Sequence, residues 1–303
     1  MPELDSDNKW VIRRSEVQDY LRCPEKWRLR WHLNRMLPPP EDPTKNALWL
    51  GTQWHSVLEY GLGAVVGCGQ MDPAELIVRA HAAAEVKLHE IRAEWPTLPK
   101  WFSSVTLTAW AAAMLQANFL AEVVAVEEQY RRPMPFWPNL WPGLCFVQTI
   151  DGLGRDQWGN LWVLEHKTTS SSVRSDELSA GYTTDGQLTA GVWVVRENGY
   201  DVKGAVLDAT RKSDAAKPTA PLAGVSIQAR PEAATQLYYE ELEETLALMA
   251  AHSEPRPLPT RRTWAPFQGR GCQCDFEPVC AAVLYGDDHK AILDRYIRRE
   301  SQL

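Results

Sequence analysis

The residues best suited to chemistry lie on either side of a short turn in the middle of the chain. Asp151 precedes the turn-forming residues 156–160, and Glu165, His166 and Lys167 follow them. The pattern around both carboxylates predicts two paired strands, which would place Asp151 near Glu165. Because residues two apart in a strand share a face, Lys167 would project beside Glu165 while His166 points away. Two carboxylates suit Mg²⁺ or Mn²⁺, and a neighbouring lysine can orient metal-bound water, so the spacing indicates metal-dependent phosphodiester cleavage.

Four cysteines near opposite ends of the chain form a second candidate site. Cys23 lies near the start, and Cys272, Cys274 and Cys280 lie near the end. Four thiolates can hold an iron–sulfur cluster or a zinc ion. The acidic first residues do not resemble a signal peptide, so we expect a reducing cytoplasm, where clustered cysteines favour metal binding over disulfides.

Two further side chains are candidates on weaker grounds. His55 lies in a predicted helix, where a single histidine is more often structural, although its imidazole would suit Mn²⁺ as well as Mg²⁺. Gln187 opens another predicted helix, where its amide could bind phosphate or orient a ligand. Glu127 is a weaker candidate acid. An isolated Glu-x-Lys is usually a surface ion pair, but the strand pattern before Glu165 favours the metal site.

Charge does not mark the whole protein as a non-specific nucleic-acid binder, because the net charge is −7 and the pI is about 5.6. Its distribution is uneven, however: residues 9–35 contain eight Lys or Arg and three acids. Arginines also cluster near the last cysteines, at Arg256, Arg261, Arg262 and Arg270. Either run could bind phosphates or be a solvated face. No apolar run is long enough to span a membrane, so we expect no membrane partner.

The order of predicted elements indicates an α/β fold with a small mixed sheet rather than a doubly wound dinucleotide fold. No GxGxxG or GxxxxGK[ST] motif is present. The predicted helices cover residues 14–35, 47–66, 73–94, 101–129, 185–196, 231–251 and 288–299. The predicted strands cover residues 144–153, 161–167 and 204–209, and residues 252–270 are predicted to be a loop.

The order of these motifs resembles that of RecB-family nucleases with an iron–sulfur cluster, a branch of the PD-(D/E)XK superfamily. This branch includes the AddB nuclease domain and the CRISPR-associated Cas-four exonucleases. The resemblance spans residues 15–280 and rests on the following matches: Ser15 to Trp27, Gly51 to His55 (G-x-x-x-H), Ile150-Asp151-Gly152, Glu165-His166-Lys167 ((D/E)-x-K), Gln187-Leu188, and Cys274 to Cys280. The chain departs from the family where only Gln273 separates Cys272 from Cys274, and where Ile150 replaces proline.

The resemblance implies a restriction-endonuclease-like core with a helical N-terminal region and a C-terminal iron–sulfur segment. We therefore expect three parts. Residues 1–130 form the helical region with the first cluster cysteine and the ligand histidine, 131–251 the nuclease core, and 252–303 the cluster segment with a final helix. The implied roles follow. Mg²⁺ or Mn²⁺ is held by His55, Asp151, Glu165 and the His166 carbonyl. Lys167 and Gln187 assist catalysis, and a [4Fe–4S] cluster is held by Cys23, Cys272, Cys274 and Cys280.

The function implied is a divalent-metal-dependent DNA exonuclease that acts at DNA ends or on single-stranded DNA. It would serve recombination, repair or CRISPR spacer processing, with recombination or CRISPR adaptation proteins as partners, in a bacterial or phage-infected cell. Two alternatives stay open at this point. One is a non-catalytic iron–sulfur module that binds DNA ends with a partner, and the other is a zinc-stabilised structural protein.

Overall fold

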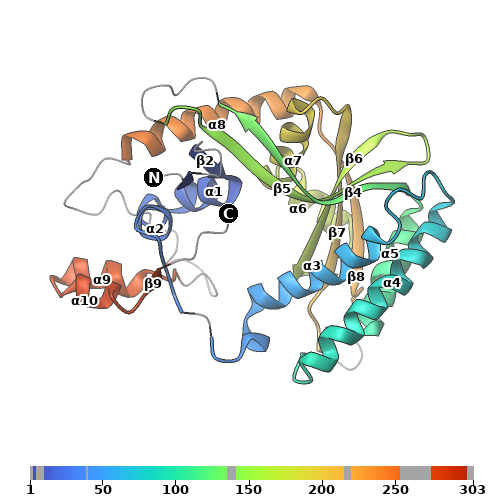
Figure 1. The fold of residues 1–303 in the computed structure, drawn as a ribbon, viewed down its shortest axis with the longest axis horizontal. Coiled ribbons are helices and arrows are strands. Elements are labelled where there is room, and N and C mark those ends of the chain that lie inside the picture. The colour runs from blue at the N-terminus through green and yellow to red at the C-terminus, as the bar shows by residue number, and fades with distance from the viewer. Residues whose placement is uncertain are drawn as a thin grey trace. The chain divides into compact units, whose positions relative to one another are not determined.

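The chain folds into two compact units, each made of segments that are separate in the sequence (Figure 1). The computed structural model describes residues 3–4, 10–38, 40–134, 141–214, 220–252 and 274–298. Unit 1 contains Met1–Pro39, Arg131–Val147 and Tyr239–Leu303, and unit 2 contains Pro40–Tyr130 and Gln148–Tyr238. The three-part division expected from the sequence stays a prediction.

The sheet of unit 2 is mixed. Strand β5 pairs with β4 and runs antiparallel to β6, β6 runs parallel to β7, and β7 runs antiparallel to β8. Their bounds are β4 Leu120–Pro133, β5 Cys145–Asp156, β6 Leu161–Thr169, β7 Val202–Arg211 and β8 Ala223–Ala229. The predicted hairpin is confirmed as β5 and β6, and helices flank the mixed sheet as an α/β fold requires.

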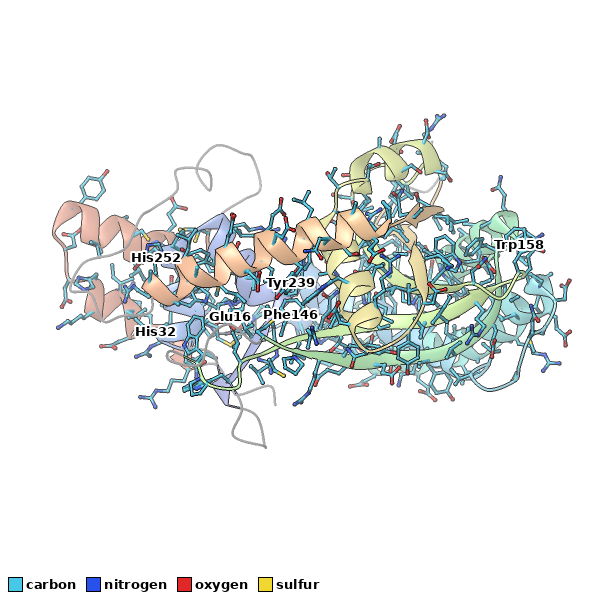
Figure 2. All side chains as sticks on the ribbon, turned by 90° about the horizontal axis from the view of Figure 1, so that it is seen from above. Glu16, His32, Phe146, Trp158, Tyr239 and His252 are labelled. Atoms are coloured by element: carbon cyan, nitrogen blue, oxygen red, sulfur yellow. The ribbon has the colours of Figure 1, made fainter. Side chains whose placement is uncertain are left out.

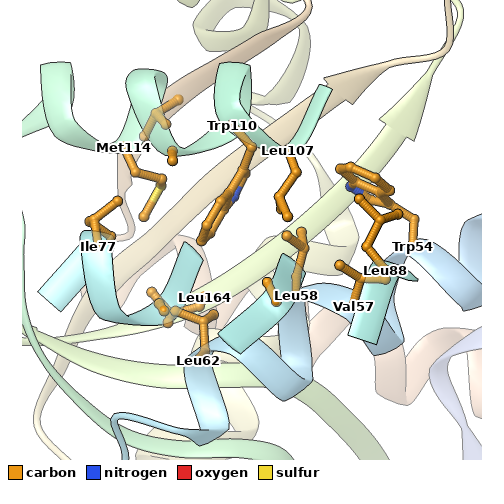
Figure 3. Close-up of a cluster of buried hydrophobic side chains, with 14 of the residues drawn as sticks. Trp54, Val57, Leu58, Leu62, Ile77, Leu88, Leu107, Trp110, Met114 and Leu164 are labelled. Atoms are coloured by element: carbon orange, nitrogen blue, oxygen red, sulfur yellow. The ribbon is translucent and has the colours of Figure 1, made fainter. Parts of the chain in front are cut away.

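Helices cover both faces of this sheet. Three of them pack with Leu164 and Val206 in one apolar cluster that includes Trp54, Leu58 and Trp110 (Figure 3). These helices are α3 Ala47–Gly63, α4 Pro73–Glu94 and α5 Ser104–Ala117. Helix α7, Gly186–Glu197, lies on the other face, where Gly191 approaches Val163. Consecutive residues of a strand point to opposite faces of the sheet. Leu164 therefore faces α3, α4 and α5, and Val163 faces α7.

Side-chain caps begin the helices that carry the predicted site. The Asn46 side chain accepts hydrogen bonds from the first amides of α3, and Asp185 does the same for α7. Asp72 caps α4, with Pro73 at its first position. These caps satisfy amide groups that have no partner inside the helix, so both α3 and α7 start at defined residues.

The predicted helix 101–129 is wrong beyond residue 117. Helix α5 ends at Ala117, where Asn118 adopts a left-handed conformation with φ of 45°. Asparagine tolerates this conformation better than most residues, and it stops the helix. The valine-rich sequence that follows forms β4, because pairing with β5 and burial decide its structure over its helical composition.

Unit 1 contains the predicted first helix in three pieces. Helix α1 covers Arg14–Arg22, α2 covers Pro24–Trp27, and a π-helical turn covers Arg28–His32. Cys23 between α1 and α2 is extended, with φ of −163°. Proline disfavours the helical conformation in the residue before it and lacks the amide that would continue the helix, so Pro24 breaks α1 at the cysteine.

The end of unit 1 also differs from the single predicted helix 288–299. The structure has α9 Glu277–Tyr285 and α10 His289–Leu293, followed by the two-residue strand β9, Ile297–Arg298. Strand β9 pairs antiparallel with β3, Arg35–Met36. Leu29, Phe276, Val279 and Tyr296 form a small apolar core in this part of the unit.

The remaining elements complete the described part of the chain. Unit 1 has β1 Glu3–Leu4 and β2 Trp10–Arg13, and β2 runs parallel to the first residues of β5. Unit 2 has a 3₁₀ turn at Pro43–Lys45 and helix α6 at Ser175–Tyr182. Helix α8 covers Glu232–His252. In these described ranges, no helix combines the length and apolar character needed to cross a membrane.

Candidate active site

Asp151 lies where the β5–β6 hairpin stops pairing in regular register. The register runs from Arg155 opposite Leu161 to Gly152 opposite Leu164. At the next position the Asp151 carboxylate accepts a hydrogen bond from the backbone amide of His166, with an N···O distance of 2.6 Å. The carboxylate is therefore fixed against β6 beside the predicted Glu-x-Lys triplet.

Glu165, Lys167 and Gln187 form one hydrogen-bonded group. Lys167 Nζ lies 2.5 Å from Glu165 Oε1 and 2.8 Å from Gln187 Oε1. The Gln187 amide nitrogen also donates to Glu165 Oε1. Glu165 and Lys167 share one face of β6, as their spacing predicts, and the Asp185 cap places Gln187 in the first turn of α7. Strand and helix together hold the lysine in one position.

His55 reaches this group from helix α3. Its Nδ1 lies 3.6 Å from Asp151 Oδ1, and its ring lies edge-on to the His166 ring with centroids 6.0 Å apart. The preceding residue, Trp54, is fully buried and donates its indole N–H to Thr210 on β7. Burial of Trp54 fixes the turn of α3 that presents His55, so the structure brings His55 and Asp151 together.

The side chain of His166 contacts a residue that the sequence analysis missed. Its Nδ1 lies 2.5 Å from Asp208 Oδ2, and both side chains are almost fully buried. Asp208 stands opposite His166 in the parallel register of β6 and β7. The available signal was a charged residue inside the apolar run 204–209, where an unpaired charge would be strongly disfavoured.

Charges within the site shift the ionisation of its members. Burial favours neutral Asp151, but the nearby His55 imidazole, the charge of His166 and the His166 amide hold the pKa of Asp151 below its usual range. Burial and the Asp151 charge raise the pKa of Glu165. Burial alone would lower the pKa of His166, but Asp208, Asp151 and Glu165 raise it to about 9.

Two more carboxylates lie in the electrostatic neighbourhood of Asp151. Burial, Asp151 and Glu59 raise the pKa of Glu127 to about 7. Glu127 has a positive φ of 48°, which is uncommon for a residue with a side chain. Glu59 follows His55 by one helical turn on α3, a spacing that could have identified it from the sequence.

The donor set of the site suits a divalent cation. Asp151 and Glu165 offer carboxylate oxygens and His55 an imidazole nitrogen, a combination that Mg²⁺ or Mn²⁺ accepts. The repulsion that raises the pKa of Glu165 is one that a bound cation would relieve. Within the described ranges, no three His, Cys, Asp or Glu side chains are already gathered at metal-binding distance. These three would therefore have to close around an ion.

The cysteine region lies in unit 1. Cys23 is buried between α1 and α2, Cys274 precedes α9, and Cys280 lies within α9. Burial raises the pKa of the Cys274 thiol. Cys272 and the four arginines of the 252–270 segment lie outside the described residues. The predicted cluster and its ligand set therefore stay a prediction.

Comparison with known proteins yields one family match. A family model for the PD-(D/E)XK nuclease superfamily matches residues 14–281. No curated protein matches the chain. Among solved structures, "Crystal structure of SSO0001" is 14% identical and covers 92% of this chain and 89% of that chain, with a TM-score of 0.37. That TM-score is too low to support an argument.

Proposed function

This chain belongs to the PD-(D/E)XK nuclease superfamily, and from that premise we propose that it is a divalent-metal-dependent nuclease that hydrolyses DNA. One observation carries the proposal. Asp151, Glu165 and Lys167 lie where the regular pairing of one hairpin ends, with the two carboxylates close enough for the charge of Asp151 to raise the pKa of Glu165. Such a group has two carboxylates that can bind a divalent metal ion and a lysine that can stabilise negative charge on the phosphate, as metal-dependent phosphodiester hydrolysis requires.

In this proposal each side chain has a distinct task. His55, Asp151, Glu165 and the His166 carbonyl would hold Mg²⁺ or Mn²⁺. A divalent cation there supplies Lewis-acid polarisation of the phosphate and a lower pKa for water. Lys167 orients the attacking water and stabilises negative charge that develops on the phosphate oxygens. Gln187 holds the side chains of Lys167 and Glu165 in place, because its amide accepts a hydrogen bond from Lys167 and donates one to Glu165.

We further propose that the enzyme is an exonuclease acting at DNA ends or on single-stranded DNA, in recombination, repair or CRISPR spacer processing. The motif order that resembles iron–sulfur RecB-family nucleases supports this finer assignment. The same resemblance supports a [4Fe–4S] cluster held by Cys23, Cys272, Cys274 and Cys280. The three of these cysteines that the structure describes lie in one compact unit.

The proposal is tested by cleavage of end-labelled single- and double-stranded DNA with Mg²⁺ or Mn²⁺, using protein purified without oxygen. Lys167→Ala should lose at least about 100-fold of the cleavage rate, because a positioned cation is removed from the reacting phosphate. Lys203→Ala is the matched control, since Lys203 is an exposed lysine of the same unit that pairs with Asp201.

Metal-dependent cleavage that Lys167→Ala abolishes and Lys203→Ala retains would support the nuclease, and the label pattern would give its polarity. Absence of cleavage by folded wild-type protein would contradict it and favour the non-catalytic DNA-end-binding module. Equal activity of wild type and Lys167→Ala would show that the chemistry lies elsewhere.

A further inference from the structure

The buried contact between His166 and Asp208 lies under helix α3, directly beside the apolar core. Two residues earlier on the same strands, Leu164 and Val206 stand opposite each other in the apolar core. His166 and Asp208 follow at the next positions on that face, with side chains 2% and 3% exposed. A buried charged pair is often no more stabilising than apolar residues of similar volume. Stability by itself therefore does not account for a charged pair at this position.

His166 contacts or adjoins every side chain proposed to hold the metal. Its amide donates to Asp151, and its ring lies edge-on to the ring of His55. Glu165 precedes it directly in β6. A change in the position of His166 would consequently move ligands that come from β5, β6 and α3.

The orientation of the His166 ring depends on Asp208. In the part of the chain that the structure describes, His166 Nε2 and Asp208 Oδ1 are buried and have no hydrogen-bond partner. The single bond between Nδ1 and Oδ2 is thus the polar contact that fixes the ring. Since both side chains are buried, neither can touch a DNA substrate directly.

We propose that the His166–Asp208 pair positions the metal ligands of this site, with Asp208 fixing the His166 ring and His166 fixing Asp151 and His55. This inference rests on the proposed nuclease function. The Asp208 side chain and the His166 ring are positioning groups, because they act through the atoms that would bind the ion. Groups that orient metal ligands through hydrogen bonds are a recurrent supporting arrangement, and their loss typically weakens metal binding or activity by about 10- to 100-fold.

The test is a titration of the protein with Mn²⁺, in which electron paramagnetic resonance measures the concentration of free ion at each step. Asp208→Asn keeps the size of the side chain and removes its charge. We expect it to weaken Mn²⁺ binding at least about tenfold. In cleavage assays kcat should fall while KM for DNA stays unchanged, because both side chains are buried and do not contact the substrate. Urea unfolding confirms that the variant is folded under the assay conditions.

Ser226→Ala is the matched control. Ser226 is a buried polar residue of the adjacent strand β8, with hydrogen bonds to Ser179 and Gln228. It stands opposite Leu207, so it lies on the other face of the sheet from Asp208. This variant should lose stability and keep the wild-type Mn²⁺ affinity. If Asp208→Asn does not fold, His166→Gln carries the same titration.

The outcomes separate this inference from the function on which it rests. Wild-type protein that binds Mn²⁺ and cleaves DNA, together with an Asp208→Asn variant of unchanged Mn²⁺ affinity and kcat, would overturn the positioning role alone. An equal loss of affinity in Ser226→Ala would also overturn it, because the effect would then be general destabilisation. Wild-type protein that binds no Mn²⁺ would overturn both the positioning role and the proposed nuclease.

Discussion

The hairpin site of unit 2 and the cysteine region of unit 1 are assembled in different ways. In the hairpin site, Asp151 bonds to an amide only 15 residues away, across one tight turn. In the cysteine region, Arg35 bonds to the Tyr296 carbonyl across 261 residues, beside the pairing of β3 with β9. Closing a long loop costs more chain entropy than closing a hairpin. A cross-link such as a metal cluster would therefore stabilise the cysteine region, which joins distant parts of the chain, more than it would stabilise the hairpin.

Buried acids also differ between the two regions. Near Cys23, Asp19 contacts Lys26 and Arg30 and accepts the Trp31 indole N–H, and Glu25 pairs with Arg28. The negative charges of Asp19 and Glu25 are therefore balanced by neighbouring lysine and arginine side chains. In the hairpin site, by contrast, the charge of Asp151 adds to burial in raising the pKa of Glu165 despite its contact with Lys167. The repulsion between Asp151 and Glu165 would be relieved by a bound cation, whereas the charges of Asp19 and Glu25 are already paired with arginine and lysine side chains.

The largest effect expected from this comparison is on chemistry. Asp151→Ala should lower the cleavage rate at least about 1,000-fold, equivalent to roughly 4 kcal/mol of activation free energy, because it removes a proposed metal ligand. DNA binding and the unfolding midpoint should change little. Single-turnover kinetics and fluorescence anisotropy with labelled DNA measure both properties. Asp201→Ala, at an exposed aspartate of the same unit, is the control. Cleavage retained by Asp151→Ala would place the metal elsewhere.

The next effect concerns stability in the cysteine region. Cys23→Ala should lower the free energy of unfolding by roughly 4 kcal/mol or more, with loss of iron and of visible absorbance, because loss of a structural metal is among the largest single-site effects. Activity per folded molecule should fall much less. Urea unfolding and iron analysis of anaerobically purified protein measure this.

Cys145→Ala is the matched control for Cys23→Ala, because Cys145 is also buried in unit 1 and fits no cluster motif. It should cost about 1 kcal/mol, as a typical buried substitution does, and leave the iron content intact. A Cys23→Ala protein as stable as the parent with full iron content would show that no cluster depends on Cys23.

The smallest effect is local to the hairpin turn. Asp156 accepts hydrogen bonds from the amides of Trp158 and Asn160, the Asn160 side chain and the Trp162 indole. Asp156→Asn should lower the free energy of unfolding at pH 7 by about 1–3 kcal/mol. One carboxylate oxygen becomes an NH₂ group, which would face the two hydrogen-bond donors that this oxygen accepted from. Metal or reductant should not alter this loss, since the turn forms without the cysteines.

The same variant has a defined pH dependence. Burial would raise the pKa of Asp156, but its hydrogen bonds with Asn160, Trp162 and Trp158 lower it overall. Its stabilisation is therefore complete above the unfolded pKa of about 3.9 and is lost as pH falls through the lower folded value. Urea unfolding of the wild type and Asp156→Asn should show the difference in their free energies of unfolding shrinking below about pH 4.

Trp158→Ala, at the exposed end of the hairpin (Figure 2), is the control and should change stability by no more than about 0.5 kcal/mol at any pH. A constant difference for Asp156→Asn across this range would contradict the role of its charge.

The parts of the fold that follow from short-range rules were predictable from the sequence. The strand period placed Glu165 and Lys167 on one face, and turn residues placed Asp151 across from them. Helices α3, α4 and α7 were also predicted close to their bounds, because their caps and apolar spacing are local. Beyond residue 117 the prediction was wrong, since pairing with β5 made a strand of a segment with helical composition.

The sequence by itself determined the hairpin, the order of the candidate ligands and their face of the strand, because these depend on contacts between near neighbours. Only the tertiary structure decided that Asp208 stands against His166, 42 residues away. The meeting of His55 with Asp151 was expected from the family resemblance, but only the structure showed how α3 brings it about. Those contacts depend on strand register and on the burial of Trp54 against β7. Register and packing join segments that are distant in the chain, so no local pattern encodes them.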